Sequence, residues 1–119
     1  MHGLGELESK VMDVLWSAAR PLRVREVLEL LDTPRPLAYT TVMTVLDNLH
    51  SKDYVRRDRV GRAYEYTAAE SREEVGARLL REVLRSSGDT ERVLLHFARS
   101  ATPEESAILR RVLRGKESS

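Results

Sequence analysis

The first half of the chain contains three stretches in which apolar residues recur three and four positions apart, the spacing of one buried helix face. These stretches predict helices over residues 6–18, 24–31 and 37–49. Two prolines within residues 32–36 exclude continuous helix and predict a turn between the second helix and the third. The pattern therefore predicts three helices, the last two joined by a turn.

The third of these helices has an exposed face that is poor in charge. Its apolar stripe is Val42, Leu46 and Leu49, and the opposite side carries threonines, Met43 and the single acid Asp47. Charged residues normally fill a solvated helix face. Small hydroxyls suit contact with base edges, because Thr can donate, accept or touch a thymine methyl group. This helix alone leaves two interpretations open, an ordinary surface or a face that reads DNA.

Residues 54–67 predict a β-hairpin, because two segments rich in β-branched and aromatic residues flank a turn at Val60-Gly61-Arg62. Five basic residues and two acidic ones lie between Lys52 and Arg62. Arginines on such a hairpin can lie along phosphates, which position a protein on DNA. An edge hairpin can also be rich in arginine simply to block sheet aggregation.

The order of elements predicts a winged helix-turn-helix, with residues 22–23 as a short extra strand beside the hairpin. The fold class is mostly α with a small β-hairpin wing, and the DNA-binding domain is expected over residues 1–68. Trp16, the only tryptophan, is expected in the core or at the seam with the C-terminal helices. The residues expected to bind DNA are Tyr39, Thr40, Thr41, Met43, Thr44 and Asn48 in the third helix and Arg57, Arg59 and Arg62 in the hairpin.

Residues 69–119 predict a helical dimerisation region. Helices are expected over residues 70–86, after Asp89 and after Thr102, and three short amphipathic helices bury their stripes against each other poorly. A second copy of the chain in a two-fold dimer would cover them, although a monomer with a helical cap remains an alternative. The residues expected at the dimer interface are Leu79, Val83, Leu94, Phe97, Ile108, Leu109, Val112 and Leu113. Two DNA-binding domains imply a dyad-symmetric operator with half-sites about 10 bp or a multiple apart.

Composition narrows the function classes. The chain has 119 residues, 33% of them charged and none of them cysteine, which excludes disulfides, zinc fingers and thiolate metal sites. It has no apolar run near the ~18 residues of a membrane span and no signal-peptide pattern, so a cytoplasmic location is expected. His2, His50 and His96 are too scattered for a metal site, and no catalytic motif is present. We therefore expect neither an enzyme nor a cofactor.

Net charge gives the DNA hypothesis little help. The formal charge is +1, and residues 1–68 hold ten basic and ten acidic side chains. A DNA-binding protein with a neutral head must segregate its charges, with acid on the far side. The alternative is a winged-helix module that binds protein without sequence-specific DNA binding. Salt dependence separates the two, because contacts with phosphates weaken steeply as salt rises.

Several ordered motifs resemble those of one known family. Residues 4–16, 24–27 and 38–49 resemble successive signatures of the penicillinase repressor (BlaI/MecI/CopY) family, and residues 92–97 and 109–113 resemble its dimerisation region. The resemblance implies a dimeric winged-helix repressor on dyad operators of resistance genes, often including its own promoter. It also implies induction, in which a membrane-bound sensor metalloprotease detects a β-lactam and the repressor is cleaved in its dimerisation region.

The chain departs from the family pattern at several positions. The Asn-Phe pair cleaved in staphylococcal-type members aligns with His96-Phe97, and Phe97 equally suits a dimer core. Many members have Arg where Asn48 lies and Gly where Asp53 lies. Asn48 can still bind a base, and Asp53 can adopt the left-handed conformation at a helix end. The absence of cysteine argues against the copper-sensing branch.

Two further side chains of the third helix carry expectations. Ala38 is a poor N-cap, which costs about 1 kcal/mol of local stability relative to Ser or Thr. Asp47 would repel phosphate, and it could instead accept from a cytosine amino group or pair with a neighbouring arginine.

Overall fold

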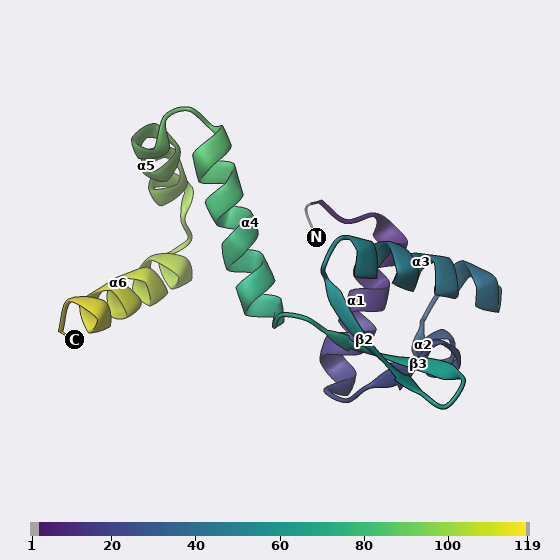
Figure 1. Cartoon of the computed structure of the whole chain (residues 1–119). Helices are drawn as coiled ribbons and strands as arrows, with labels where there is room; N and C mark the ends of the chain where they lie inside the picture. Colours follow the sequence, from purple (N-terminus) through teal and green to yellow (C-terminus); the bar gives the residue numbers. More distant parts are fainter. Residues whose placement is uncertain (1–2, 119) are drawn as a thin grey trace. The chain divides into compact units, whose positions relative to one another are not determined.

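The computed structural model describes residues 3–118, with side chains described as far as residue 117. The chain forms two compact units, Met1–Ala77 and Arg78–Ser119. The elements, labelled in Figure 1 except for β1, are α1 (Glu6–Ala18), β1 (Leu22–Arg23), α2 (Val24–Leu30), α3 (Tyr39–Ser51), β2 (Val55–Val60), β3 (Ala63–Ala68), α4 (Arg72–Ser86), α5 (Thr90–Ser100) and α6 (Pro103–Ser118). The predicted order of helices and strands is confirmed.

The first unit is a winged helix whose core lies between α1, α2, α3 and the sheet. Val42, Leu46 and Leu49, the predicted stripe of α3, are fully buried. Full burial of one such side chain contributes about 1.5–3 kcal/mol. The other core residues of this unit include Val11, Met12, Leu15, Leu22, Val27, Val45, Val55, Tyr66 and Val75. Because the stripe of α3 faces inward, its threonine-rich side faces outward.

The sheet has three antiparallel strands in the order β1-β3-β2. Leu22 pairs with Tyr66, which confirms the expected short strand, and the hairpin register runs from Val55 opposite Ala68 to Val60 opposite Ala63. Gly61 begins the two-residue turn with φ +65°, a conformation that favours glycine. Figure 1 shows the resulting hairpin beside α3.

The ends of α3 fix its position. At the C-terminus of α3 the N–H of Tyr54 donates to the carbonyl of Leu49 (2.9 Å). The N–H of Asp53 donates to the carbonyl of His50 (3.1 Å). Asp53 has φ +64°, so these bonds form a Schellman motif with Asp in the left-handed position. At the N-terminus Ala38 provides no side-chain cap, as expected. The chain therefore passes directly from the Schellman motif of α3 into the hairpin.

The start of α4 belongs to the first unit. Trp16 Nε1 donates to the carbonyl of Glu70 (3.0 Å), and Arg72 lies 5.1 Å from the centre of the Trp16 ring and 3.3 Å from Asp13 Oδ1. Val75 is only 1% exposed. The compact unit therefore extends beyond the boundary expected at residue 68, because the first turns of α4 pack on the winged helix.

The second unit contains the rest of α4 with α5 and α6. Asp89 caps α5 by accepting from the N–H of Arg92 (3.0 Å). Thr102 and Glu105 form the expected capping box at α6, with distances of 2.8 and 3.1 Å. Over the described residues α5 and α6 contain no buried side chain, so their apolar faces are open. Among residues 3–118 no helix is long and apolar enough to cross a membrane.

Candidate nucleic-acid interface

The outward face of α3 carries the side chains that the sequence predicted for it. Tyr39, Thr40, Thr41, Met43, Thr44 and Asn48 are all exposed. The hydroxyl of Thr44 donates to the carbonyl of Thr40 (2.9 Å), a common back-bond within a helix. Its proton is therefore engaged, and its oxygen lone pairs and methyl group remain available. This face can accept hydrogen bonds and make small apolar contacts.

The hairpin brings two arginines and two tyrosines to one face, because alternate strand residues share a side. Arg57 lies opposite Tyr66 and Arg59 opposite Tyr64. The guanidinium carbons of Arg57 and Arg59 lie 4.4 and 5.6 Å from the centre of the Tyr64 ring. These are cation–π distances. Tyr64 thus holds both arginines along the strand, while Arg62 lies in the exposed turn.

One ion pair joins α3 to the hairpin. Arg57 Nη1 donates to Asp47 Oδ1 at 3.0 Å. A hydrogen bond with Tyr66 raises the pKa of Arg57, and burial raises the pKa of Tyr66 itself. Asp47 was expected either to accept from a cytosine amino group or to pair with a neighbouring arginine. In the protein without DNA it pairs with Arg57.

A hollow of about 370 Å³ separates α3 from the hairpin. It is lined by Val24, Met43, Asp47, His50, Ser51, Arg57, Tyr64 and Tyr66. A helix with a free face, flanked by a projecting basic hairpin, can enter a groove as wide as the DNA major groove while the hairpin reaches the backbone.

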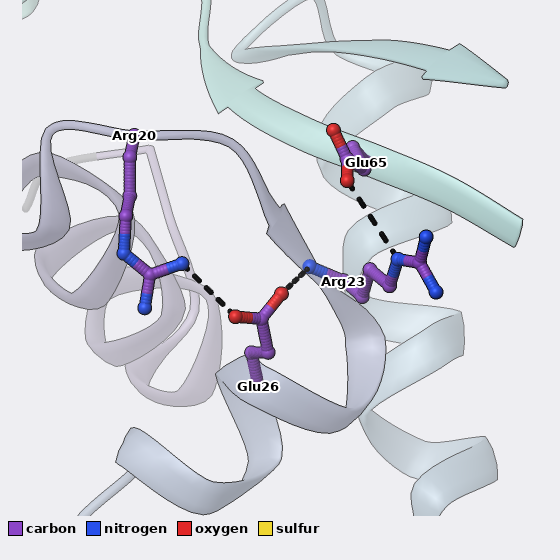
Figure 2. Close-up of polar contacts among 4 residues, drawn as sticks. All are labelled: Arg20, Arg23, Glu26 and Glu65. Atoms are coloured by element: carbon purple, nitrogen blue, oxygen red, sulfur yellow. Dashed lines mark hydrogen bonds and ion pairs between the residues drawn. The ribbon is translucent and has the colours of Figure 1, made fainter. Parts of the chain in front are cut away.

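Ion pairs neutralise several acidic side chains of the first unit. Figure 2 shows Glu26 accepting from Arg20 Nη1 (2.9 Å) and from the N–H of Arg23 (3.0 Å), while Arg23 Nε lies 3.6 Å from Glu65 Oε2. The Arg23 N–H, and then Arg20, hold the pKa of Glu26 below its usual value. Lys52 Nζ likewise lies 2.9 Å from Glu8 Oε1.

Three arginines of the hairpin have no acidic partner among the described residues. In the part of the chain that the structure describes, Arg56, Arg59 and Arg62 form no ion pair. Several acids of the first unit are thus neutralised by bases outside this set, and the three hairpin arginines are exposed. Sequence reasoning found the basic cluster but missed the Glu26 network. The one local signal of this network was Glu26 at the third position of α2, where a Glu commonly accepts from the backbone N–H of the N-cap residue.

The predicted dimer and cleavage residues lie in the helices α4–α6, outside this interface. Leu79 is 8% exposed. Exposed apolar side chains at the other predicted positions are Val83, Leu94, Phe97, Ile108, Leu109, Val112 and Leu113. His96 and Phe97 lie within α5, so a protease would need this helix to open locally before it could cut between them.

Metal-binding residues do not converge anywhere in residues 3–118, where no group of three His, Cys, Asp or Glu side chains could hold an ion. His50 lies on α3 and His96 on α5, and His2 lies outside the described residues.

A family profile described as penicillinase repressor matches residues 4–115 of the chain. The chain belongs to the penicillinase repressor family. Within curated relatives, the transcriptional regulator BlaI of Mycobacterium tuberculosis, matched in two strains, is 43% identical over 113 residues, covering 92% of this chain and 82% of the relative. These relatives are named as regulators, which confirms the prediction that this penicillinase repressor family member is not an enzyme.

Solved structures show the same fold as this family member. The reduced form of MarR from E. coli has a TM-score of 0.50 at 20% identity, covering 94% of this chain and 76% of MarR. FabT of Streptococcus pneumoniae, in complex with DNA, has a TM-score of 0.51 at 19% identity, covering 98% of this chain and 75% of FabT. At these identities the likeness concerns the fold alone, and it confirms the winged helix.

Proposed function

We propose that the chain is a DNA-binding transcriptional repressor in which α3 reads bases and the hairpin holds phosphates. The observation that carries the proposal is the hydroxyl-rich, exposed face of α3 beside a hairpin whose arginines Arg59 and Arg62 form no ion pair with any residue that the structure describes. Tyr39, Thr40, Thr41, Met43, Thr44 and Asn48 supply contacts in the major groove, where each base pair has a distinct pattern of donors and acceptors. Membership in the penicillinase repressor family supports this assignment.

The repressor acts as a homodimer through the exposed apolar faces of α4, α5 and α6. Nine large apolar side chains there are at least 40% exposed in the single chain: Leu80, Val83, Leu94, Leu95, Phe97, Ile108, Leu109, Val112 and Leu113. Exposed apolar surface on this scale marks an interaction site in soluble proteins. A two-fold dimer buries the same faces of both copies and presents two winged helices to a dyad-symmetric operator.

The target genes are those of β-lactam resistance, with the repressor's own promoter among the operators, and the site of action is the cytoplasm. Release follows cleavage in the dimerisation region by a membrane-bound sensor protease, at or beside His96-Phe97. The physical logic is effective concentration, because two linked heads bind far more tightly than separate ones. Cutting the link removes that gain without changing either head.

Footprinting on the DNA upstream of the chain's own gene tests the proposal. We expect protection of two half-sites related by a dyad, with centres about 10 bp or a multiple apart. A single protected half-site would contradict the dimer. No protection anywhere in that DNA would remove autoregulation, and no protection on any genomic fragment would favour the protein-binding alternative.

A further inference from the structure

The outward face of α3, which is assigned to base reading, contains one acidic side chain that should oppose binding. Asp47 lies on the outward face of α3 and is 54% exposed. A free carboxylate there would repel phosphates and weaken binding to every sequence. Its position next to the hairpin explains how the fold accommodates it.

Arg57 reaches Asp47 from the neighbouring strand β2, and contacts with other side chains of the protein hold it in place. Besides the 3.0 Å hydrogen bond to Asp47, its guanidinium carbon lies 4.4 Å from the centre of the Tyr64 ring. Its strand partner Tyr66 is fully buried in the core. The side chain of Arg57 is only 28% exposed, whereas Arg59, two residues further along, has no acidic partner among the described residues. Arg57 therefore already has an acidic partner and an aromatic contact within the protein.

We infer that Asp47 and Arg57 form a positioning pair that holds the hairpin against α3, and that Arg57 is not a phosphate contact. The sequence-based expectation had placed Arg57 among the phosphate ligands. The inference rests on the proposed function, since it assigns a role within the same DNA-binding surface. The pair neutralises Asp47 where it lies and fixes the distance between the base-reading helix and the phosphate-binding hairpin. The pair therefore contributes to the preference for the operator over random DNA, while Arg59 and Arg62 supply the electrostatic affinity.

Two isosteric variants separate positioning from direct contact. In Asp47→Asn the carboxylate is gone and Arg57 is released, so binding to random DNA should tighten. The salt slope should steepen by about one phosphate per subunit, at about 0.9 in log–log slope for each phosphate. In Arg57→Gln no phosphate contact is lost, but the freed carboxylate of Asp47 should weaken binding to both operator and random DNA. The salt slope should therefore fall less than in a variant that loses a phosphate ligand. Both variants should lower the ratio of operator to random affinity by about tenfold or more.

Matched controls come from the same hairpin. Asp58→Asn removes a carboxylate from β2 that forms no ion pair in the described residues, and Arg59→Gln removes an arginine of the same face. Asp58→Asn should leave the operator preference unchanged, and Arg59→Gln should lower the salt slope by about one phosphate per subunit. If Arg57→Gln lowers the slope as much as Arg59→Gln does, Arg57 binds phosphate and the inference is overturned.

A second readout needs no DNA. Backbone order parameters of residues 57–66, measured by NMR relaxation, should fall in Asp47→Asn and Arg57→Gln and stay unchanged in Asp58→Asn. Unchanged order in both pair variants would overturn the positioning role even if DNA binding changed. If the wild-type protein binds no operator while the hairpin order falls as expected, the proposed function fails and the pairing itself stands.

Discussion

Phe97 gives the sharpest test of the proposed dimer. It lies within α5, it is the only phenylalanine, and its side chain is 49% exposed in the single chain. No side chain of α5 is buried, so truncation there removes little from the stability of one chain. Replacement of Phe97 by Ala should therefore weaken the dimer and leave the fold intact.

The size of the effect follows from the exposed fraction. Full burial of an aromatic or large aliphatic side chain contributes about 1.5–3 kcal/mol, so burying the exposed half of Phe97 contributes about 1 kcal/mol. A two-fold interface contains the residue twice. The loss is then about 2 kcal/mol per dimer, which corresponds to a dissociation constant about 30-fold higher, since about 1.4 kcal/mol is tenfold.

Sedimentation equilibrium over a range of concentrations measures this constant directly. His96→Ala is the matched control, because His96 is the exposed neighbour of Phe97 in the same helix and is not among the residues assigned to the interface. Circular dichroism checks that both variants keep their helices. The interface would be refuted if the dissociation constant of Phe97→Ala equalled that of the wild type. It would also be refuted if Phe97→Ala and His96→Ala had the same dissociation constant.

Four further expectations concern the winged helix. Arg59→Ala and Arg62→Ala should each reduce the salt slope of DNA binding by about one per subunit with no change in base preference; a changed preference at constant slope would show that the hairpin does not hold phosphates. Thr44→Ala should cost about 1–3 kcal/mol on the operator and little on random DNA in a competition assay; equal losses on both would exclude base reading. Trp16→Phe removes the hydrogen bond to Glu70 and should lower the free energy of unfolding in urea by about 1 kcal/mol, so an unchanged midpoint would show that this bond is dispensable. The Gly5 N–H and Lys52 hold the pKa of Glu8 below its usual 4.5, so the stability from Glu8 is present above that pH and is lost as pH falls through the lowered pKa. Glu8→Gln should thus be less stable than wild type at pH 7 and equal to it at strongly acidic pH, and a difference that persists in acid would contradict the linkage.

Local patterns were sufficient to predict most of the fold. The stripe of Val42, Leu46 and Leu49 identified both the buried and the outward side of α3 because helix periodicity links the two. Gly61 marked the hairpin turn, and Thr102 marked the start of α6. The start of α4 was expected at residue 70 and lies at Arg72, although the Ser71 and Glu74 capping box that begins it was readable in the sequence.

Contacts between residues distant in sequence could not be predicted in the same way. The Lys52–Glu8 pair joins residues 44 positions apart, and the bond from Trp16 to Glu70 joins residues 54 apart. Such contacts depend on how helices pack, which periodicity does not specify. Arg57 shows the consequence for the site, since its pairing with Asp47 follows from the distance between helix and strand and not from its place in a basic cluster.

A salt-titrated anisotropy assay on the DNA upstream of the chain's own gene, against a scrambled duplex, tests the central claim most directly. We predict tight binding to the upstream DNA alone, with two chains per duplex. With 6–10 phosphates neutralised, affinity should fall about 10³–10⁵-fold between 50 and 200 mM salt. Weak binding to both duplexes that changes little with salt would contradict a repressor that uses α3 and the hairpin to hold DNA.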